Sequence, residues 1–166
     1  MKLRLAGAAV ACVLIALPGR AAAEWTLGNS TEGGVATVFL TRSTTYGGAV
    51  AFVCDNRSAA SEYVLVVTSP FDAVLGRLDV TMAVGAQPPA TTIWTATPRD
   101  NILRSRAVMV RDVLAALATE PGIVFTATDD FGRSYRVEAP MENLNELVPG
   151  FLAGCDGLPP APLRRF

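Results

Sequence analysis

Beyond residue 24, short runs of apolar and β-branched residues follow one another between turn-forming residues, and this pattern predicts short β-strands. Runs rich in Val, Thr, Phe and Ile, separated by turn-forming residues, predict strands at 35–41, 49–54, 62–68, 77–84, 91–96, 123–127 and 134–138. Residues 25–27 are expected to add an edge strand. Connections this short favour antiparallel pairing, because a parallel crossover needs about a dozen residues or more.

Two later segments have the period of a helix. In the first, one face carries four apolar residues: Val110, Val113, Leu114 and Leu117. We expect this helix to begin at an N-cap, Ser105, and to end at Pro121 and Gly122. In the second, a complete apolar stripe is formed by Leu144, Leu147, Val148, Phe151, Leu152 and Cys155. Pro149 lies off that stripe and is expected to kink the helix.

These elements predict an α+β fold, in which an antiparallel sheet, as a small sandwich or a partial barrel, packs against two amphipathic helices. We expect a single globular domain over residues 24–156. The Pro-rich segment 157–166 has no periodicity and is expected to be a flexible tail.

The first 23 residues have the pattern of a secretory signal peptide. Lys2 and Arg4 precede an apolar run from Leu5 to Leu17, and small residues lead to an expected cleavage after Ala23. The run is too short to cross a membrane, and no later segment is long and apolar enough to do so. Lipoprotein processing at Cys12 is the alternative, but this cysteine lies in the middle of the run instead of at its end. We therefore expect a periplasmic or secreted protein without a transmembrane anchor.

Beyond the expected cleavage, Cys54 and Cys155 are the only cysteines. A lone pair of thiols in an exported protein indicates one disulfide, with two free thiols as the alternative. The bridge would close a loop of about 100 residues and stabilise the fold by up to about 4.7 kcal/mol in the chain-entropy account.

Charge excludes a further class of function. Without Lys2, Arg4 and Arg20, 11 of the 14 basic residues remain against 15 acidic ones, so the exported chain is net acidic. This balance differs from that of a nucleic-acid binder, and we expect no nucleic-acid partner.

The chain lacks most of the residue types on which familiar catalytic sites depend. The chain has no histidine, and its only lysine is Lys2, which excludes histidine-based triads, histidine metal sites and lysine bases. Asp129 and Asp130 are adjacent, in the manner of ordinary turn residues. We therefore expect no catalytic residues, no metal and no cofactor, and a carboxylate-dependent hydrolase is the least favoured alternative.

Arg104 and Arg106 flank the expected N-cap Ser105, and a helix N-terminus attracts anions. They are the candidate contact for an anion or an anionic partner, with solvated surface arginines as the plain alternative. Trp94 has the spacing of a strand residue and is expected in the core more than at a sugar.

The layout as a whole resembles a family of small exported bacterial proteins. It combines an early Trp, a strand Ala51-Phe52-Val53-Cys54 that ends in the first cysteine, Trp94, a helix, a hairpin with Gly132, and a final amphipathic helix that ends in Cys155. This order is similar to that of proteins of the invasion-associated locus B type, and the type VI secretion-associated VasI-like proteins have a similar outline. The resemblance implies an exported accessory protein with no known catalytic residues.

Together these features predict a non-enzymatic periplasmic accessory or interaction protein whose partner is another envelope protein. A protein that binds a small ligand or a cell-wall glycan is the alternative function. The oligomeric state is left open.

Overall fold

Nine strands and two helices make up the fold in the computed structural model, which describes residues 24–44, 48–57, 62–67, 76–97, 102–106, 108–128 and 132–160. The strands are β1 (Thr26–Glu32), β2 (Val35–Ser43), β3 (Ala49–Asp55), β4 (Glu62–Val67), β5 (Gly76–Val84), β6 (Ala90–Thr97), β7 (Ile102–Ser105), β8 (Gly122–Thr128) and β9 (Ser134–Pro140). The helices are α1 (Val110–Leu117) and α2 (Leu144–Asp156).

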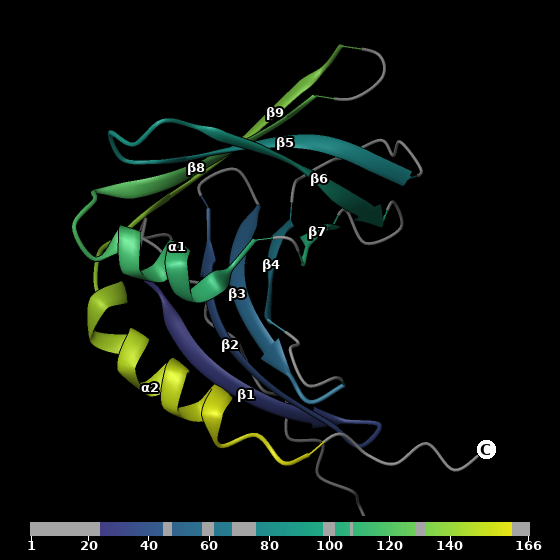
Figure 1. Cartoon of the computed structure of the whole chain (residues 1–166), viewed down its shortest axis with the longest axis vertical. Helices are drawn as coiled ribbons and strands as arrows, with labels where there is room; N and C mark the ends of the chain where they lie inside the picture. Colours follow the sequence, from purple (N-terminus) through teal and green to yellow (C-terminus); the bar gives the residue numbers. More distant parts are fainter. Residues whose placement is uncertain are drawn as a thin grey trace, which may run out of the picture.

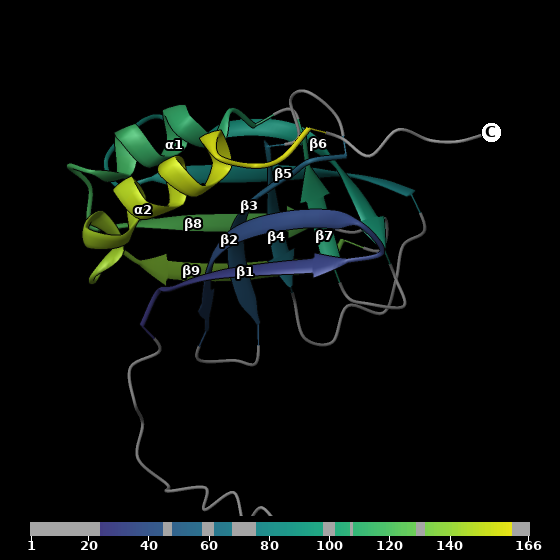
Figure 2. The ribbon, with the colours of Figure 1, turned by 90° about the horizontal axis from the view of Figure 1, so that it is seen from below.

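All nine strands belong to one antiparallel sheet in the order β1-β2-β3-β4-β7-β6-β5-β8-β9. The sheet is open, with β1 and β9 at its edges. It bends so that the half with β1 to β4 faces the half with β5, β6, β8 and β9 (Figure 1). Seen from below, β3 and β4 run across the direction of β5 and β8 (Figure 2). The predicted antiparallel α+β class is therefore confirmed at this level of detail.

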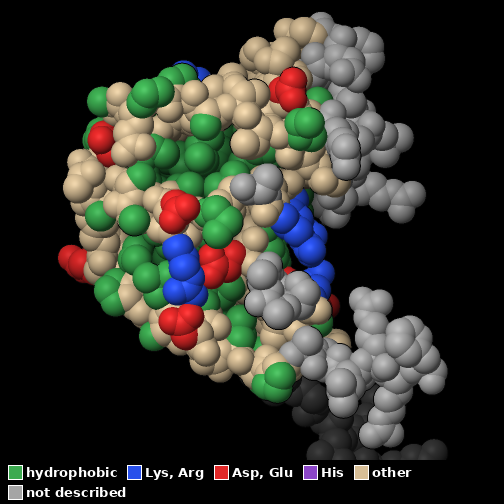
Figure 3. Space-filling view, in the orientation of Figure 1, with side chains coloured by type: hydrophobic (Ala, Val, Ile, Leu, Met, Phe, Trp, Pro, Cys, Tyr) green, Lys and Arg blue, Asp and Glu red, His purple; other side chains and the backbone are tan. Residues whose placement is uncertain are grey.

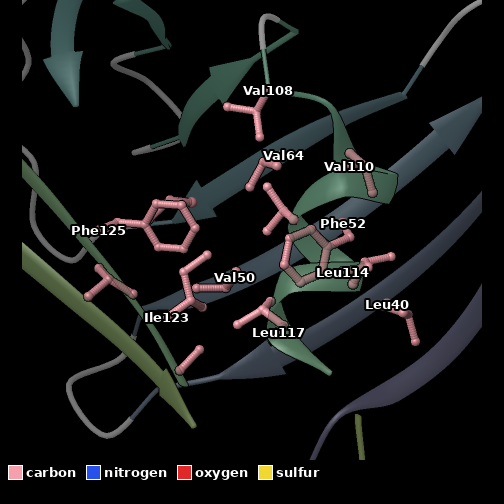
Figure 4. Packing of buried hydrophobic residues seen from close by; sticks show 14 of the residues in the cluster. Leu40, Val50, Phe52, Val64, Val108, Val110, Leu114, Leu117, Ile123 and Phe125 are labelled. Carbon is pink, nitrogen blue, oxygen red and sulfur yellow. The ribbon is translucent and has the colours of Figure 1, made fainter. Parts of the chain in front are cut away.

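The core lies on the face of the sheet that carries both helices. Along most of the strands, buried side chains that face the helices alternate with side chains on the other face of the sheet. Val110 and Leu114 of α1 lie beside Phe52, Val50 and Val64 of the sheet (Figure 4). Trp94 is completely buried in this core, as expected, and meets Phe125 edge to face with ring centroids 5.5 Å apart.

Helix α2 packs along β2 and β1 through its predicted stripe. Leu144 and Phe151 are fully buried, and the other members of the stripe pack against the core. Pro149 lies inside this helix. The small residue Gly154 allows close approach to β2, because a Cβ there would meet Val38 at 3.1 Å.

The sequence prediction was wrong in the region between β6 and α1. Residues 102–105 form strand β7, which was not predicted, and Ser105 is its last residue instead of a helix N-cap. Helix α1 begins only at Val110, with Met109 in the cap position and no capping side chain. Ile102 to Ser105 form a strand because they pair with β4 on one side and β6 on the other, which local periodicity does not reveal.

The two edges of the sheet meet near the start of β1. Trp25 Nε1 donates a hydrogen bond of 2.8 Å to the Pro140 carbonyl, and Arg42 Nη1 donates one of 3.2 Å to the same oxygen. Asn143 holds Trp25 from the other side: its Oδ1 accepts from the Trp25 N–H at 3.0 Å and its Nδ2 donates to the Trp25 carbonyl at 3.1 Å. These bonds connect the β1 edge to the turn between β9 and α2.

Candidate functional site

The predicted disulfide is present and joins the end of β3 to the end of α2. Cys54 and Cys155 are bonded, with their Cα atoms 5.8 Å apart. An ion-pair network lies at the same corner: Arg111 of α1 donates to Glu62 and to Asp156, each at 2.7 Å. Glu62 lies opposite Cys54 in the sheet and Asp156 follows Cys155. Both helices are therefore fastened to one place on the sheet.

The same network raises the pKa of Arg111 above its ordinary value, through hydrogen bonds first to Glu62 and then to Asp156. Because the Arg111 side chain is 43 % exposed, water screens these pairs and their contribution to stability is small. Figure 3 shows basic and acidic side chains side by side over the helices.

Arg104 and Arg106 lie on the outer face of the sheet, the face opposite the helices. In β4, Val64 and Val66 point into the core, so Tyr63 and Leu65 point to the opposite face. Arg104 lies opposite Leu65 on β7 and therefore points to that same outer face. Both guanidinium groups lie over the Tyr63 ring, with their central carbons 5.0 Å (Arg104) and 5.8 Å (Arg106) from its centroid. We call Tyr63, Arg104 and Arg106 the arginine–tyrosine cluster.

The position of this cluster shows that the expected helix N-terminus between Arg104 and Arg106 was wrong. Arg104 and Arg106 do not flank a helix N-terminus, since α1 begins four residues after Arg106, at Val110. The helix dipole therefore adds little to their attraction for an anion, because that effect falls off within the first turn. Arg104 also differs from a solvated surface arginine: it is half-buried, and its Nε is buried without a hydrogen-bond partner among the described residues.

Two further residues from the end of β3 border the cluster. Asp55 is buried, and its Oδ1 accepts a hydrogen bond of 2.9 Å from the Arg57 N–H. Its Oδ2 lies 3.4 Å from Arg57 Nε. Burial raises the pKa of Tyr63, the nearby Asp55 carboxylate raises it further, and Arg104 and Arg57 partly oppose these effects. Tyr63, only 3 % exposed, is thus a neutral aromatic support beneath two cations.

The two arginines of the cluster differ from other arginines in their partners. Arg42 pairs with Glu142, Arg57 with Asp55, Arg111 with Glu62 and Asp156, and Arg136 with Glu138. Within the part of the chain that the structure describes, no carboxylate lies within ion-pairing distance of Arg104 or Arg106. Figure 3 shows basic side chains gathered on the side of β4 and β7.

A pocket of about 360 Å³ lies beside β5, β8 and β9, toward the β9 edge of the sheet. It is formed where β5, β8 and β9 carry small residues, and it is lined by Ala83, Gly85, Pro121, Gly122, Ile123, Val124, Glu138, Ala139 and Pro140. Gly122 is required here because a Cβ would meet the Ala139 carbonyl at 3.0 Å. Glu138 is the only charged side chain of the lining, and it pairs with Arg136.

Other candidate chemistry is limited. Asp129 and Asp130 lie outside the described residues. Over the described ranges, no three His, Cys, Asp or Glu residues are grouped so that they could hold a metal ion. The same ranges contain no helix with the length and apolarity to span a bilayer.

Sequence reasoning found the two arginines but missed Tyr63 and Asp55. The run Glu62-Tyr63-Val64-Leu65-Val66-Val67 is apolar at both parities, so its pattern does not show which face is the core. Only the pairing of β4 with β7 places Tyr63 beneath the arginines.

Comparison with known proteins adds no relative. No protein-family model matches the chain, and neither a curated protein nor a solved structure matches it.

Proposed function

We propose that this chain is a non-enzymatic accessory protein, exported by a signal peptide over residues 1–23, that acts in the bacterial periplasm by binding another envelope protein. The proposal includes its kinship with the invasion-associated locus B type and VasI-like proteins that it resembles. The observation that carries it is the pair of guanidinium groups held over Tyr63 in a net acidic protein, without an acidic partner in the described part of the chain.

The spacing of the two arginines favours an extended acidic segment as the partner. Arg104 lies in β7 and Arg106 directly follows the last residue of that strand, and two residues of extended chain span about 7 Å. Carboxylates two residues apart in an extended partner segment repeat at the same distance. Each guanidinium can bind a carboxylate through two parallel N–H donors.

The Tyr63 ring preorganises Arg104 and Arg106 for binding. Stacking on a buried tyrosine limits the freedom of both guanidinium groups before the partner arrives. Less side-chain entropy is then lost on association.

A peptide titration tests the chemistry. We expect an extended peptide with Glu at alternate positions to bind more tightly than a peptide of equal composition with its Glu residues in adjacent pairs. Arg106→Ala should weaken binding of the alternating peptide several-fold, and more at low salt, where screening is least. Arg136→Ala removes an exposed charge elsewhere and is the matched control. Equal binding of both peptides, or of inorganic phosphate alone with the same affinity, would contradict the proposal.

Crosslinking in cells that export the protein tests the biological role. Thr95 lies opposite Arg104 on β6 and is exposed, so a photoreactive residue there should capture the partner. We expect one main adduct that is lost with Arg106→Ala and kept with Arg136→Ala. A probe at Ser134 of β9, far along the sheet, should not give that adduct. An adduct that is unaffected by Arg106→Ala would place the partner elsewhere.

The pocket between β5, β8 and β9 supports a second function, the binding of a small ligand. Its volume is within the usual range of ligand sites, and its lining is mainly apolar. A cell-wall glycan is less favoured, because both tryptophans are buried and offer no surface for stacking. Trp25 bonds to Pro140 at the pocket wall, so its fluorescence should change when a small apolar ligand binds. Trp25→Phe should abolish that change without altering affinity.

As a finer description of the fold, we propose a partial barrel in preference to a sandwich. The strand order is continuous, and the Trp25 bonds to Pro140 and Asn143 bring the two edges of the sheet together at one corner.

A further inference from the structure

The end of β3 and the start of β4 carry different side chains on the two faces of the sheet. Cys54 belongs to the core and is bonded to Cys155 of α2, whereas the next residue, Asp55, points to the outer face. Across the ladder, Glu62 lies opposite Cys54, and Tyr63 lies opposite Val53. We call these paired strand ends, residues 53–55 and 62–63, the β3–β4 corner.

Strand pairing holds this corner less firmly than it holds the rest of β4. Residues 64–67 pair with β3 on one side and with β7 on the other. Within the described part of the chain, Glu62 and Tyr63 pair with β3 alone, because β7 ends at Ser105, opposite Val64. The position of Tyr63 beneath the arginines therefore depends on the end of β3.

Two attachments on the inner face fix the β3–β4 corner, and both lead to the end of α2. The Cys54–Cys155 bond ties β3 to the last turn of this helix. Arg111 donates to Glu62 and to Asp156, the residue after Cys155, so the same end of α2 also restrains the start of β4. Loss of the covalent bond would free the end of α2 and weaken both attachments together.

The outer face of the corner carries polar groups that favour its opening. The Asp55 side chain has no exposed surface, and Tyr63 beside it is 3 % exposed. The ion-pair partner of Asp55 is Arg57, which is half exposed and has its Nε 3.4 Å from the carboxyl oxygen. Burial of such polar groups is unfavourable compared with their hydration, so water enters once the strand ends can move. The disulfide opposes this opening from the other face of the sheet.

We propose that the Cys54–Cys155 disulfide controls the arginine–tyrosine cluster, so that the cluster has its binding geometry only in the oxidised chain. When the bond forms, the two thiols give two electrons and two protons to the disulfide of an oxidant, which becomes a pair of thiols. The corner then closes and holds Tyr63 beneath Arg104 and Arg106. The consequence for binding rests on the proposed function: the oxidised chain binds its acidic partner, and the reduced chain binds it weakly.

Hydrogen exchange tests the closure of the corner without any partner. The purified chain is compared in its oxidised form and after reduction with dithiothreitol, whose two thiols become a disulfide. On reduction, exchange should rise about ten-fold or more in residues 53–55 and 62–63, and by less than about two-fold in β5. Fluorescence of Trp94, which is buried against Phe125 in the other half of the sheet, should show that the fold is kept.

Titration with the alternating-Glu peptide tests the consequence for binding. The dissociation constant should rise about ten-fold on reduction while Trp94 stays buried. Arg111→Ala keeps the disulfide and removes only the second attachment, so it should raise the dissociation constant by about two-fold in the oxidised chain. Arg136→Ala removes an exposed charge far from the corner and is the matched control, with the same ratio between the two redox forms as the unaltered chain.

Three results would overturn the proposal. The first is equal peptide affinity in the folded oxidised and reduced chains. The second is unchanged exchange at the β3–β4 corner on reduction. The third is unfolding of the whole chain on reduction, since the bond would then act on the fold and not on the cluster. A peptide that binds neither form would contradict the proposed function instead, and the exchange measurement would still decide whether the disulfide controls the corner.

Discussion

Tyr63 is a single residue whose pKa is changed by tertiary packing. Two guanidinium groups lie over its ring, the Asp55 carboxylate is nearby, and the side chain is almost completely buried. Burial, and then Asp55, disfavours the tyrosinate form, so the pKa of Tyr63 lies above its ordinary value of 10.0. The folded chain consequently holds this proton more tightly than the unfolded chain does.

This shift leads to a prediction for alkaline stability. The contribution of Tyr63 to the free energy of unfolding is fully present below pH 10 and is lost as the pH rises through the raised pKa. Tyr63→Phe cannot ionise and should flatten this alkaline decline in the melting temperature, while its stability near neutral pH changes by about 1 kcal/mol or less. Tyr135→Phe is the control. An alkaline decline that is the same in Tyr63→Phe and the unaltered chain would show that Tyr63 does not cause it.

Arg104 requires a revised expectation for the same reason. From the sequence, removal of Arg104 and Arg106 should leave stability nearly unchanged, as for exposed charges. The structure stacks Arg104 over a buried ring, so Arg104→Ala should destabilise the fold by about 0.5–2 kcal/mol, and the exposed Arg106→Ala by less. Urea unfolding of the two single variants measures this difference. Equal losses would mean that the stacking of Arg104 contributes nothing.

At the scale of elements, helix α2 is held by two kinds of link of unequal strength. The Cys54–Cys155 bond is covalent and closes a loop of 101 residues. The Arg111 network is exposed and screened. The disulfide should therefore dominate the attachment of α2.

Replacement of both cysteines by alanine should lower the free energy of unfolding by about 2–5 kcal/mol. Arg111→Ala should lower it by about 1 kcal/mol or less, and by still less at high salt. Hydrogen exchange should rise in α2 more than in β5 and β8 when the disulfide is removed, because α2 packs mainly on β1 and β2 at the sheet edge. Unchanged protection of α2 would mean that packing of Phe151 and Leu144 suffices.

The lengths and pairing of the strands explain which of them could be predicted from the sequence and why β7 could not. The strands β2, β3, β4, β5, β6, β8 and β9 were located to within a few residues, because each is a short run rich in β-branched and apolar residues with turn-forming residues at its ends. β7 has only four residues, too few for a clear period, and a neighbouring serine resembled a helix cap. β7 forms through the pairing that β4 and β6 offer on either side.

At the scale of the whole molecule, the continuous sheet predicts cooperative unfolding. Trp25 lies at the β1 edge and stacks on Phe52, and Trp94 lies in the other half against Phe125. The core runs unbroken between them. Local disruption should therefore reach both tryptophans together.

Single-tryptophan variants measure this cooperativity. Trp25→Phe reports on Trp94, and Trp94→Phe reports on Trp25. Within each variant, the fluorescence midpoint in denaturant should equal the midpoint followed by far-ultraviolet circular dichroism, as expected for two-state unfolding. A Trp25 signal that is lost before the secondary structure would show that the β1 edge and α2 unfold as a separate unit.

The strand-rich class, the buried stripe of α2 and the cysteine pair follow from the amino-acid order alone, because they depend on local patterns of residues or on the number of thiols. Tertiary structure decided the strand order, the face on which Arg104 and Arg106 lie, and the burial of Tyr63 beneath them. β4 pairs with β7 some 40 residues later, and β5 pairs with β8 across α1. Such pairings depend on which edges are free when the core closes, and no local pattern of side chains records that choice.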